Sequence, residues 1–135
     1  MCIRDRYFSS TLWRFKLIED IKKISIKHIP DERGDMFVIE NNITLDMNFV
    51  RTFLVYGNRN INRGNHAHKK CSQLLIAING TIEVICKDSD KERKFVLSNP
   101  KEALLIPPKI WSIQIYKEDN SIPVSYTHLT LPTKA

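Results

Sequence analysis

The feature of this chain that most restricts its fold is a two-residue alternation of apolar and polar side chains, in short stretches that end at turn residues. Such alternation places the apolar side chains on one face of a β-strand. Alternation, richness in β-forming residues or, at residues 73–78, a short apolar run predicts strands over residues 24–28, 36–40, 50–56, 73–78, 81–86, 93–97, 103–106 and 111–116. Many short strands at near-regular spacing predict an all-β sandwich or barrel.

The segments between these strands are predicted to be turns and loops. Asn79-Gly80 is typical of a type I′ hairpin turn, which would pair the strands on either side of it. Residues 31–35 are predicted to form a charged turn and residues 57–65 a polar loop. Residues 7–22 fit a short amphipathic helix only loosely.

Composition restricts the class of protein further. The 135 residues suffice for one ordinary domain, and 42% hydrophobic with 27% charged residues is typical of a globular protein. No apolar run is long enough to span a bilayer, and no signal-peptide pattern follows the first residues, so we expect a cytoplasmic protein without a membrane partner. The net charge of +6 comes from basic residues scattered among acidic ones, which does not favour nucleic acid as a partner.

The three cysteines are an odd number and contain no CxxC pair. This pattern predicts neither a disulfide framework nor a zinc site. We therefore expect Cys71 and Cys86 to be small buried side chains.

The strongest functional feature is the segment from Arg63 to His68, in which His66 and His68 are separated by one residue. In an extended chain this spacing puts both imidazoles on the same face. A pair of this kind suits metal binding or proton transfer, because an imidazole is a metal ligand and titrates near neutrality. Acid–base chemistry is the favoured interpretation, with a residual metal site and a purely structural or ligand-binding pair as alternatives.

The surrounding residues resemble the two motifs of the cupins. Gly64, the His-x-His pair, Gln73 and Gly80 resemble the first motif, and residues 107–112 resemble the second. The resemblance implies a cupin-type jelly-roll barrel with its site in the barrel mouth. A metal cupin uses two His and one Glu from the first motif and one His from the second.

This chain lacks two of those four ligands. Gln73 stands at the Glu position and Ser112 at the second-motif His position. A neutral amide is a poor ligand for a divalent cation, and two imidazoles fall short of the ligand sets usual for catalytic metals. We therefore expect no metal and no other cofactor, and we interpret His66 and His68 as acid–base groups.

A more specific resemblance is to the sugar 3,4-ketoisomerases of the WxcM-like, FdtA-type cupin family. The residues that carry it are Arg63-Gly64-x-His66-Ala67-His68-Lys69, Gln73-x-Leu75, Asn79-Gly80, Leu105-Ile106-Pro107-Pro108-x-Ile110-Trp111 and the turn Asp31-Glu32-Arg33-Gly34. The resemblance implies a homodimer that moves the ketone of a dTDP-4-keto-6-deoxyhexose from C4 to C3. Its product would serve the synthesis of an amino-deoxysugar for a surface polysaccharide.

The resemblance also suggests which residues hold the substrate. Arg33 and Arg63 are candidates for the diphosphate, because a guanidinium matches phosphate oxygens. Three further candidates are Lys69, Gln73 and Trp111. Two departures from the family concern substrate contacts: Ser112 stands where the family often has His, and Phe53 stands where some members have Tyr. Tyr56 and Tyr116 are assigned to packing of the barrel.

Both ends of the chain resemble translated sequencing-adaptor sequence. We expect residues 1–6 and 124–135 to be non-native and residues 7–123 to be the cupin domain, with its C-terminal strand truncated. The alternative is that residues 125–131 form a genuine edge strand ended by Pro132.

Two other functions fit parts of the pattern. A sugar-nucleotide 3,5-epimerase has a similar barrel, but its His–Asp dyad has no counterpart in residues 63–70. A non-catalytic domain that binds nucleotide sugars would need the barrel but not the proton transfer. Product analysis and the effect of replacing His66 discriminate between these functions.

Overall fold

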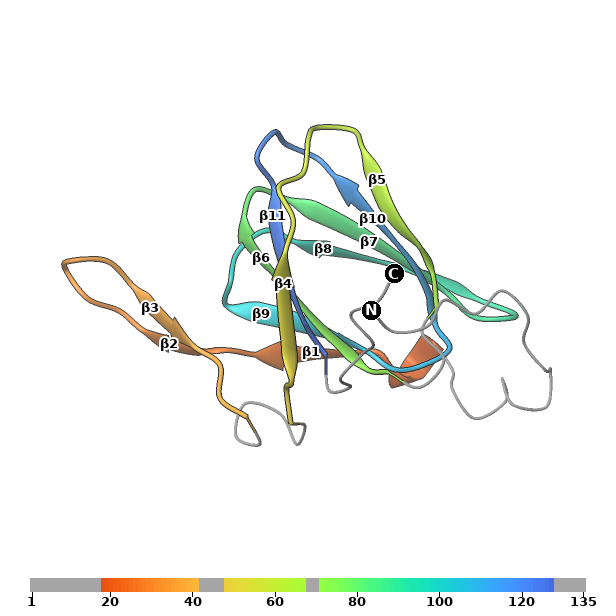
Figure 1. The fold of residues 1–135 in the computed structure, drawn as a ribbon, viewed down its shortest axis with the longest axis horizontal. Helices are drawn as coiled ribbons and strands as arrows, with labels where there is room; N and C mark the ends of the chain where they lie inside the picture. Colours follow the sequence, from red (N-terminus) through yellow and green to blue (C-terminus); the bar gives the residue numbers. More distant parts are fainter. Residues whose placement is uncertain (1–17, 42–47, 68–70, 128–135) are drawn as a thin grey trace.

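The computed structural model describes residues 18–41, 48–67 and 71–127. Within them, eleven strands and one short 3-10 helix form two facing sheets and a separate hairpin (Figure 1). The first sheet has the order β1 (Lys22–Ser25), β9 (Glu102–Ile106), β6 (Gln73–Asn79), β11 (Ile122–Thr127) and β4 (Arg51–Leu54). The second has the order β5 (Asn62–His66), β10 (Trp111–Tyr116), β7 (Ile82–Lys87) and β8 (Glu92–Leu97).

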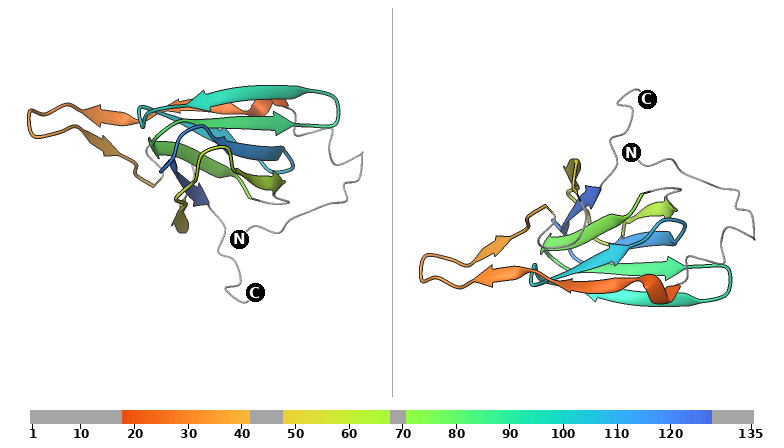
Figure 2. Two further views of the ribbon diagram at one scale, coloured as in Figure 1. Left: turned by 90° about the horizontal axis from the view of Figure 1, so that it is seen from above. Right: turned by 90° about the horizontal axis from the view of Figure 1, so that it is seen from below.

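The remaining elements lie at the N-terminal side of the described chain. The 3-10 helix η1 covers Ile18–Asp20 and leads into β1. Strands β2 (Lys27–Ile29) and β3 (Met36–Val38) pair with each other and form a hairpin that projects from the barrel (Figures 1 and 2). The amphipathic helix predicted over residues 7–22 is observed only as η1, and residues 7–17 lie outside the described part.

The main core lies between the two sheets, as the alternation predicts. Along β7 the side chains of Ile82, Val84 and Cys86 are buried, while those between them are half-buried. They belong to one cluster with Leu75 and Ala77 of β6, and strands β8 and β9 add further members. The period-two pattern thus buries one face of each strand against the opposite sheet. The predicted all-β, cupin-type jelly-roll architecture is confirmed.

A second core covers the outer face of the five-stranded sheet. Leu74 and Ile76 of β6 point away from the barrel interior and pack with Ile26 and Ala103. Phe37 of the hairpin is among the half-buried side chains that complete this cluster. Strand β6 is consequently apolar on both faces, which explains why its sequence is a continuous apolar run rather than an alternating one.

The predicted hairpin at Asn79-Gly80 is wrong, although a turn lies there. Strands β6 and β7 belong to different sheets, so the turn carries the chain from one layer to the other. Strand β6 already has β9 and β11 as its neighbours, which leaves no edge for β7. Gly80 has φ +74, and a Cβ there would lie 2.6 Å from the Ser121 hydroxyl oxygen, so the crossing requires glycine.

Two further predictions about residues 50–65 need correction. The polar loop predicted over residues 57–65 ends early, because β5 begins at Asn62. The strand predicted to reach Tyr56 ends at Leu54, and the Tyr56 side chain is 74% exposed. Tyr56 therefore does not pack the barrel.

Strand β11 was not among the predicted strands. It runs from Ile122 to Thr127 and pairs with β6 on one side and β4 on the other. The alternative prediction was an edge strand at residues 125–131. These residues overlap β11, which lies inside the sheet, and the strand at that edge of the sheet is β4. Residue 124, where the non-native segment was predicted to begin, lies within β11.

The two cysteines expected to be small buried side chains are both buried. Cys86 is a free thiol, and burial raises its pKa to about 12. Cys71 is disulfide-bonded, which the odd number of cysteines did not indicate.

Among the described residues no helix is long and apolar enough to cross a bilayer.

Candidate functional site

The candidate site begins with His66, the last residue of β5. His66 pairs with Ser112 of β10, and Ser112 pairs in turn with Cys86 of β7. Directly paired residues in antiparallel strands share a face of the sheet. Because Cys86 belongs to the core between the sheets, the His66 side chain lies on the interior face. It is half-buried, and its Nδ1 atom is fully covered.

A β-bulge brings Arg63 onto the same face as His66. In a regular strand, residues three apart point to opposite faces. Here Arg63 pairs with Gln114 and His66 pairs with Ser112. The two paired residues are three positions apart on β5 but only two positions apart on β10, so β5 contains one extra residue. The extra residue is accommodated at Gly64 and Asn65, which have φ +96 and +56. Arg63 and His66 therefore face the interior together, although the Arg63 side chain remains exposed.

Gly64 is required for this bulge. A Cβ at this position would lie 2.9 Å from the Ser112 carbonyl oxygen, closer than side-chain carbons approach backbone oxygens. The left-handed φ of Gly64 adds a conformational cost for any other residue. The alternation of apolar residues did not reveal the bulge. The adjacent pair Gly64-Asn65 was the available signal, because Gly and Asn are the residues that most readily adopt positive φ.

The opposite wall of the site is formed by Gln73 and Ser125. The Gln73 Nε2 donates a hydrogen bond of 2.7 Å to the Ser125 hydroxyl, and both side chains are buried. Ser112 is buried as well. The two positions that supply Glu and His in metal cupins are thus occupied by neutral groups in the interior. Among residues 18–41, 48–67 and 71–127, no three His, Cys, Asp or Glu side chains are grouped so that they could hold a metal ion.

Tyr116 packs in the main core, as predicted, and brings a hydroxyl group into it. It is on the same face of β10 as Ser112 and Gln114, and 1% of the residue is exposed. Its hydroxyl is buried and has no hydrogen-bond partner among the described residues. Burial raises the pKa of the phenol, and the charge of Arg63 acts in the opposite direction. The phenol is therefore protonated at neutral pH and able to donate a hydrogen bond.

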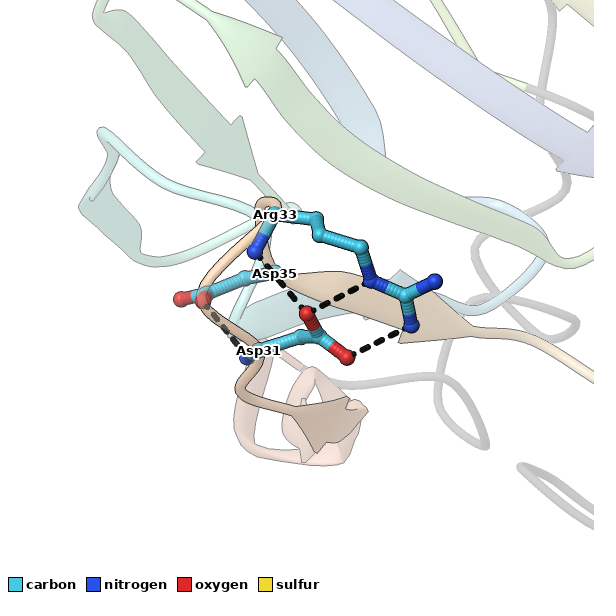
Figure 3. A network of polar contacts seen from close by, with 3 residues as sticks. All are labelled: Asp31, Arg33 and Asp35. Carbon is cyan, nitrogen blue, oxygen red and sulfur yellow. Dashed lines mark hydrogen bonds and ion pairs between the residues drawn. The ribbon is translucent and has the colours of Figure 1, made fainter.

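Arg33 lies elsewhere, in the turn of the projecting β2–β3 hairpin. Its Nε and Nη2 donate to the two carboxylate oxygens of Asp31 at 2.9 and 2.8 Å (Figure 3). These hydrogen bonds hold the pKa of Asp31 at about 2. Beside them, His28 and Asp35 form a contact of 2.7 Å between Nε2 and Oδ2. The hairpin extends from the side of the barrel away from β5, so one chain does not bring Arg33 and His66 together (Figure 1).

The other predicted site residues are placed less favourably or not at all. Trp111 is half-buried and pairs with Lys87, on the face of β10 opposite to Ser112. It therefore does not face the interior that holds His66. His68 and Lys69 lie outside the described residues, so the predicted convergence of the two imidazoles stays a prediction.

Comparison with known proteins finds sugar 3,4-ketoisomerases among the proteins similar to this chain. Over 91 residues the chain is 33% identical to the TDP-4-oxo-6-deoxy-α-D-glucose 3,4-oxoisomerase of Aneurinibacillus thermoaerophilus, which covers 67% of this chain and 66% of that protein. The sugar 3,4-ketoisomerase QdtA of Thermoanaerobacterium thermosaccharolyticum, solved with TDP, has a TM-score of 0.82 and 26% identity, covering 86% and 85% of the two chains. The TDP-quinovose 3,4-ketoisomerase WlaRB of Campylobacter jejuni has a TM-score of 0.80 and 25% identity, covering 87% and 92%.

The family model described as WxcM-like, C-terminal (FdtA) matches residues 19–127, which include every described site residue. The resemblance inferred from the motifs is therefore confirmed. The chain belongs to the WxcM-like, FdtA-type family.

Proposed function

We propose that this protein is a metal-independent sugar-nucleotide 3,4-ketoisomerase that moves the keto group of a dTDP-4-keto-6-deoxyhexose from C4 to C3. The observation that carries the proposal is the placement of His66 and Arg63 on one interior face, made possible by the bulge at Gly64. A proton-transfer group and a phosphate-binding group then face the same space. The relatives described above are named for this activity.

The reaction needs proton transfer only. The hydrogen on C3 is acidic because C3 is next to the C4 carbonyl, and its removal gives an enediolate. Return of a proton to C4, with transfer of a proton between the two oxygens, completes the shift of the ketone. We assign His66 as the base at carbon and His68 as the shuttle between oxygens, each contributing roughly 10²–10⁴-fold to the rate.

Substrate binding is assigned to the remaining candidates. Arg63 is proposed to bind the diphosphate, because its guanidinium forms no ion pair within the described part of the chain and faces the site. Gln73 is proposed to contact the sugar through its carbonyl oxygen, since its amide nitrogen is bonded to Ser125. Lys69 is proposed as a further contact with the nucleotide, whereas Trp111 faces away from the interior of its own chain and is not assigned to that site.

We propose that the enzyme works as a homodimer in the cytoplasm. The outer face of the five-stranded sheet exposes two large apolar side chains, Leu54 at 57% and Ile78 at 47%. Met36 of the hairpin is 57% exposed. Contact with a second copy would cover these side chains, because exposed apolar groups on a sheet are stabilised by burial. Arg33 would then act on the diphosphate from the hairpin of the second copy.

The decisive test is replacement of His66 by Asn. His66→Asn removes the proposed carbon base, so turnover should fall by at least about a thousand-fold while TDP affinity stays within about two-fold. Turnover is measured by NMR of the product formed from TDP-4-oxo-6-deoxyglucose. His28→Asn is the matched control, because the His28 imidazole contacts Asp35 and is assigned no contact with the substrate, so its loss should not remove the proton transfer.

Three results would contradict the proposal. A wild-type product that keeps its ketone at C4 and is inverted at C3 or C5 indicates a 3,5-epimerase. Binding of the sugar nucleotide without any conversion indicates a non-catalytic binding domain. Stoichiometric zinc, iron or manganese in the purified protein, with activity lost on chelation, replaces the acid–base assignment of His66 with a metal site.

A further inference from the structure

Gln114 is a polar side chain on the interior face of β10 that the fold leaves open to solvent. It pairs with Val84 of β7, which is fully buried in the core between the two sheets, so both side chains are on that face. Its neighbours on this face of β10, Ser112 and Tyr116, are buried, whereas Gln114 is only half-buried. Solvent therefore reaches the interior face at Gln114.

The amide of Gln114 is available to a ligand. Within residues 18–41, 48–67 and 71–127 it takes part in no hydrogen bond. Gln73 differs, because its side chain is buried and its amide nitrogen donates to Ser125. A glutamine amide has two N–H donors and a carbonyl acceptor, so it can pair with a hydroxyl group in either direction.

The strand register places Gln114 next to two residues that are assigned to the substrate. Gln114 pairs directly with Arg63 of β5, which puts their Cβ atoms roughly 5 Å apart. His66 pairs with Ser112, two residues along β10 from Gln114, so His66 is a diagonal neighbour of Gln114 at about 7–8 Å. Long side chains reach across such a diagonal. A substrate that contacts Arg63 and His66 therefore lies within reach of Gln114.

The covalent structure of the substrate shows which of its groups would lie there. In a dTDP-hexose the diphosphate is attached at C1, and the proposed reaction removes a proton from C3. Carbon C2 joins C1 to C3, so its hydroxyl lies between the group assigned to Arg63 and the atom assigned to His66. The exposure of the residues agrees with this order, because the Arg63 side chain is exposed while those of Gln114 and His66 are half-buried.

We propose that Gln114 is a further substrate-binding residue, whose amide forms a hydrogen bond with the hydroxyl at C2 of the bound hexose. The inference rests on the proposed ketoisomerase function and adds a residue that the motifs do not contain. The contact favours hexoses with a hydroxyl at C2 over 2-deoxyhexoses, so Gln114 contributes to substrate specificity.

The test compares two nucleotide sugars in two proteins. Binding of TDP-4-oxo-6-deoxyglucose and of its 2-deoxy analogue is measured by calorimetry in the His66→Asn background, where neither sugar is converted. With Gln114 intact, we expect loss of the C2 hydroxyl to lower the affinity about three- to ten-fold. Gln114→Met keeps the length of the side chain and removes the amide, so this variant should bind the two sugars with affinities that agree within about two-fold.

Two controls accompany this comparison. Affinity for TDP should be the same with and without Gln114→Met, which also shows that the variant is folded. Asn62→Leu is the matched variant, because Asn62 is an exposed amide on β5 that pairs with Ile115 and points to the outer face of the sheet. This variant should keep the preference for the sugar with the C2 hydroxyl.

Three results would overturn the inference. Equal affinity for the two sugars with Gln114 intact would mean that the C2 hydroxyl is not recognised, and this result needs no variant of Gln114. A preference that persists in Gln114→Met would place the hydroxyl at another residue. An equal loss of affinity for TDP and for the nucleotide sugar in Gln114→Met would place the amide at the diphosphate. Failure of the proposed function is separately visible, because the wild-type protein would then not convert TDP-4-oxo-6-deoxyglucose.

Discussion

The interior of the barrel and the turn of the projecting hairpin each carry an arginine that was a candidate for the diphosphate. Arg63 lies on the interior face of β5 beside His66, and no carboxylate of the described chain is paired with it. Arg33 lies in an exposed turn, and its guanidinium is already bonded to both oxygens of Asp31. The comparison teaches that a motif residue can bind a ligand in the site of its own chain only where the fold leaves its donors available and directs them toward that site.

The largest expected effect concerns the two glycines that shape these regions. Gly64→Ala should lower kcat/KM about a hundred-fold, because a Cβ would strain the bulge and shift Arg63 relative to His66. Gly34→Ala is the control, since Gly34 also has a positive φ but a Cβ there meets nothing within 4 Å. Circular dichroism establishes that both variants fold. Equal losses of activity would show that the bulge is not needed for the site.

A smaller effect is expected from the arginines themselves. Arg63→Gln should weaken TDP binding about ten- to a hundred-fold, because a charge-assisted contact with phosphate is lost. Arg33→Gln should weaken TDP binding less, because the wild-type Arg33 must break its ion pair with Asp31 before it can bind phosphate. Calorimetry with TDP measures both variants. A greater loss for Arg33→Gln would reverse the comparison and place the hairpin at the phosphates.

The smallest effect is confined to the hairpin. The Asp31 carboxyl should titrate at about 2 in the wild type and at a higher pH in Arg33→Gln, where only the hydrogen bond from the backbone amide of residue 33 still lowers its pKa, as measured by carboxyl NMR. Since the pKa is lowered in the folded state, the associated stabilisation is present above pH 3.8 and is lost as the pH falls through about 2. It is small, because the pair is exposed. Asp35, whose pKa is lowered chiefly by His28, is the internal control and should not respond.

Much of the fold followed from alternation, and the exceptions have physical causes. Strands such as β7 and β10 were predicted within one or two residues, because one face of each is buried. Strand β11 was not among the predicted strands, because residues 124–135 were interpreted as non-native, and because its buried Ser125 and Thr127 carry no apolar signal. The Asn79-Gly80 turn was assigned to a hairpin because turn chemistry shows where the chain reverses and not which sheet it enters.

The candidate site was predictable in part for a similar reason. His66 was found from its spacing to His68 and from the cupin motif around it. The shared face of Arg63 and His66 depends on a bulge, and spacing alone places residues three apart on opposite faces. Tyr56 and Tyr116 were treated alike, yet one is exposed and the other buried. Which side of a strand faces the interior is decided by the opposite sheet, and a single strand does not contain that information.

The position of β11 determines which strands of the barrel can unfold locally. Strand β4 is at the edge of its sheet and is hydrogen-bonded only to β11 among the strands of that sheet. Amides of β4 should therefore exchange with solvent at least as fast as those of β11, because β4 has no other backbone partner to retain it whereas β11 is also paired with β6. Loss of residues 124–127 would leave β4 unpaired and would expose the edge of β6 that β11 covers, although β6 would keep its pairing with β9, and both strand edges would then be open to aggregation.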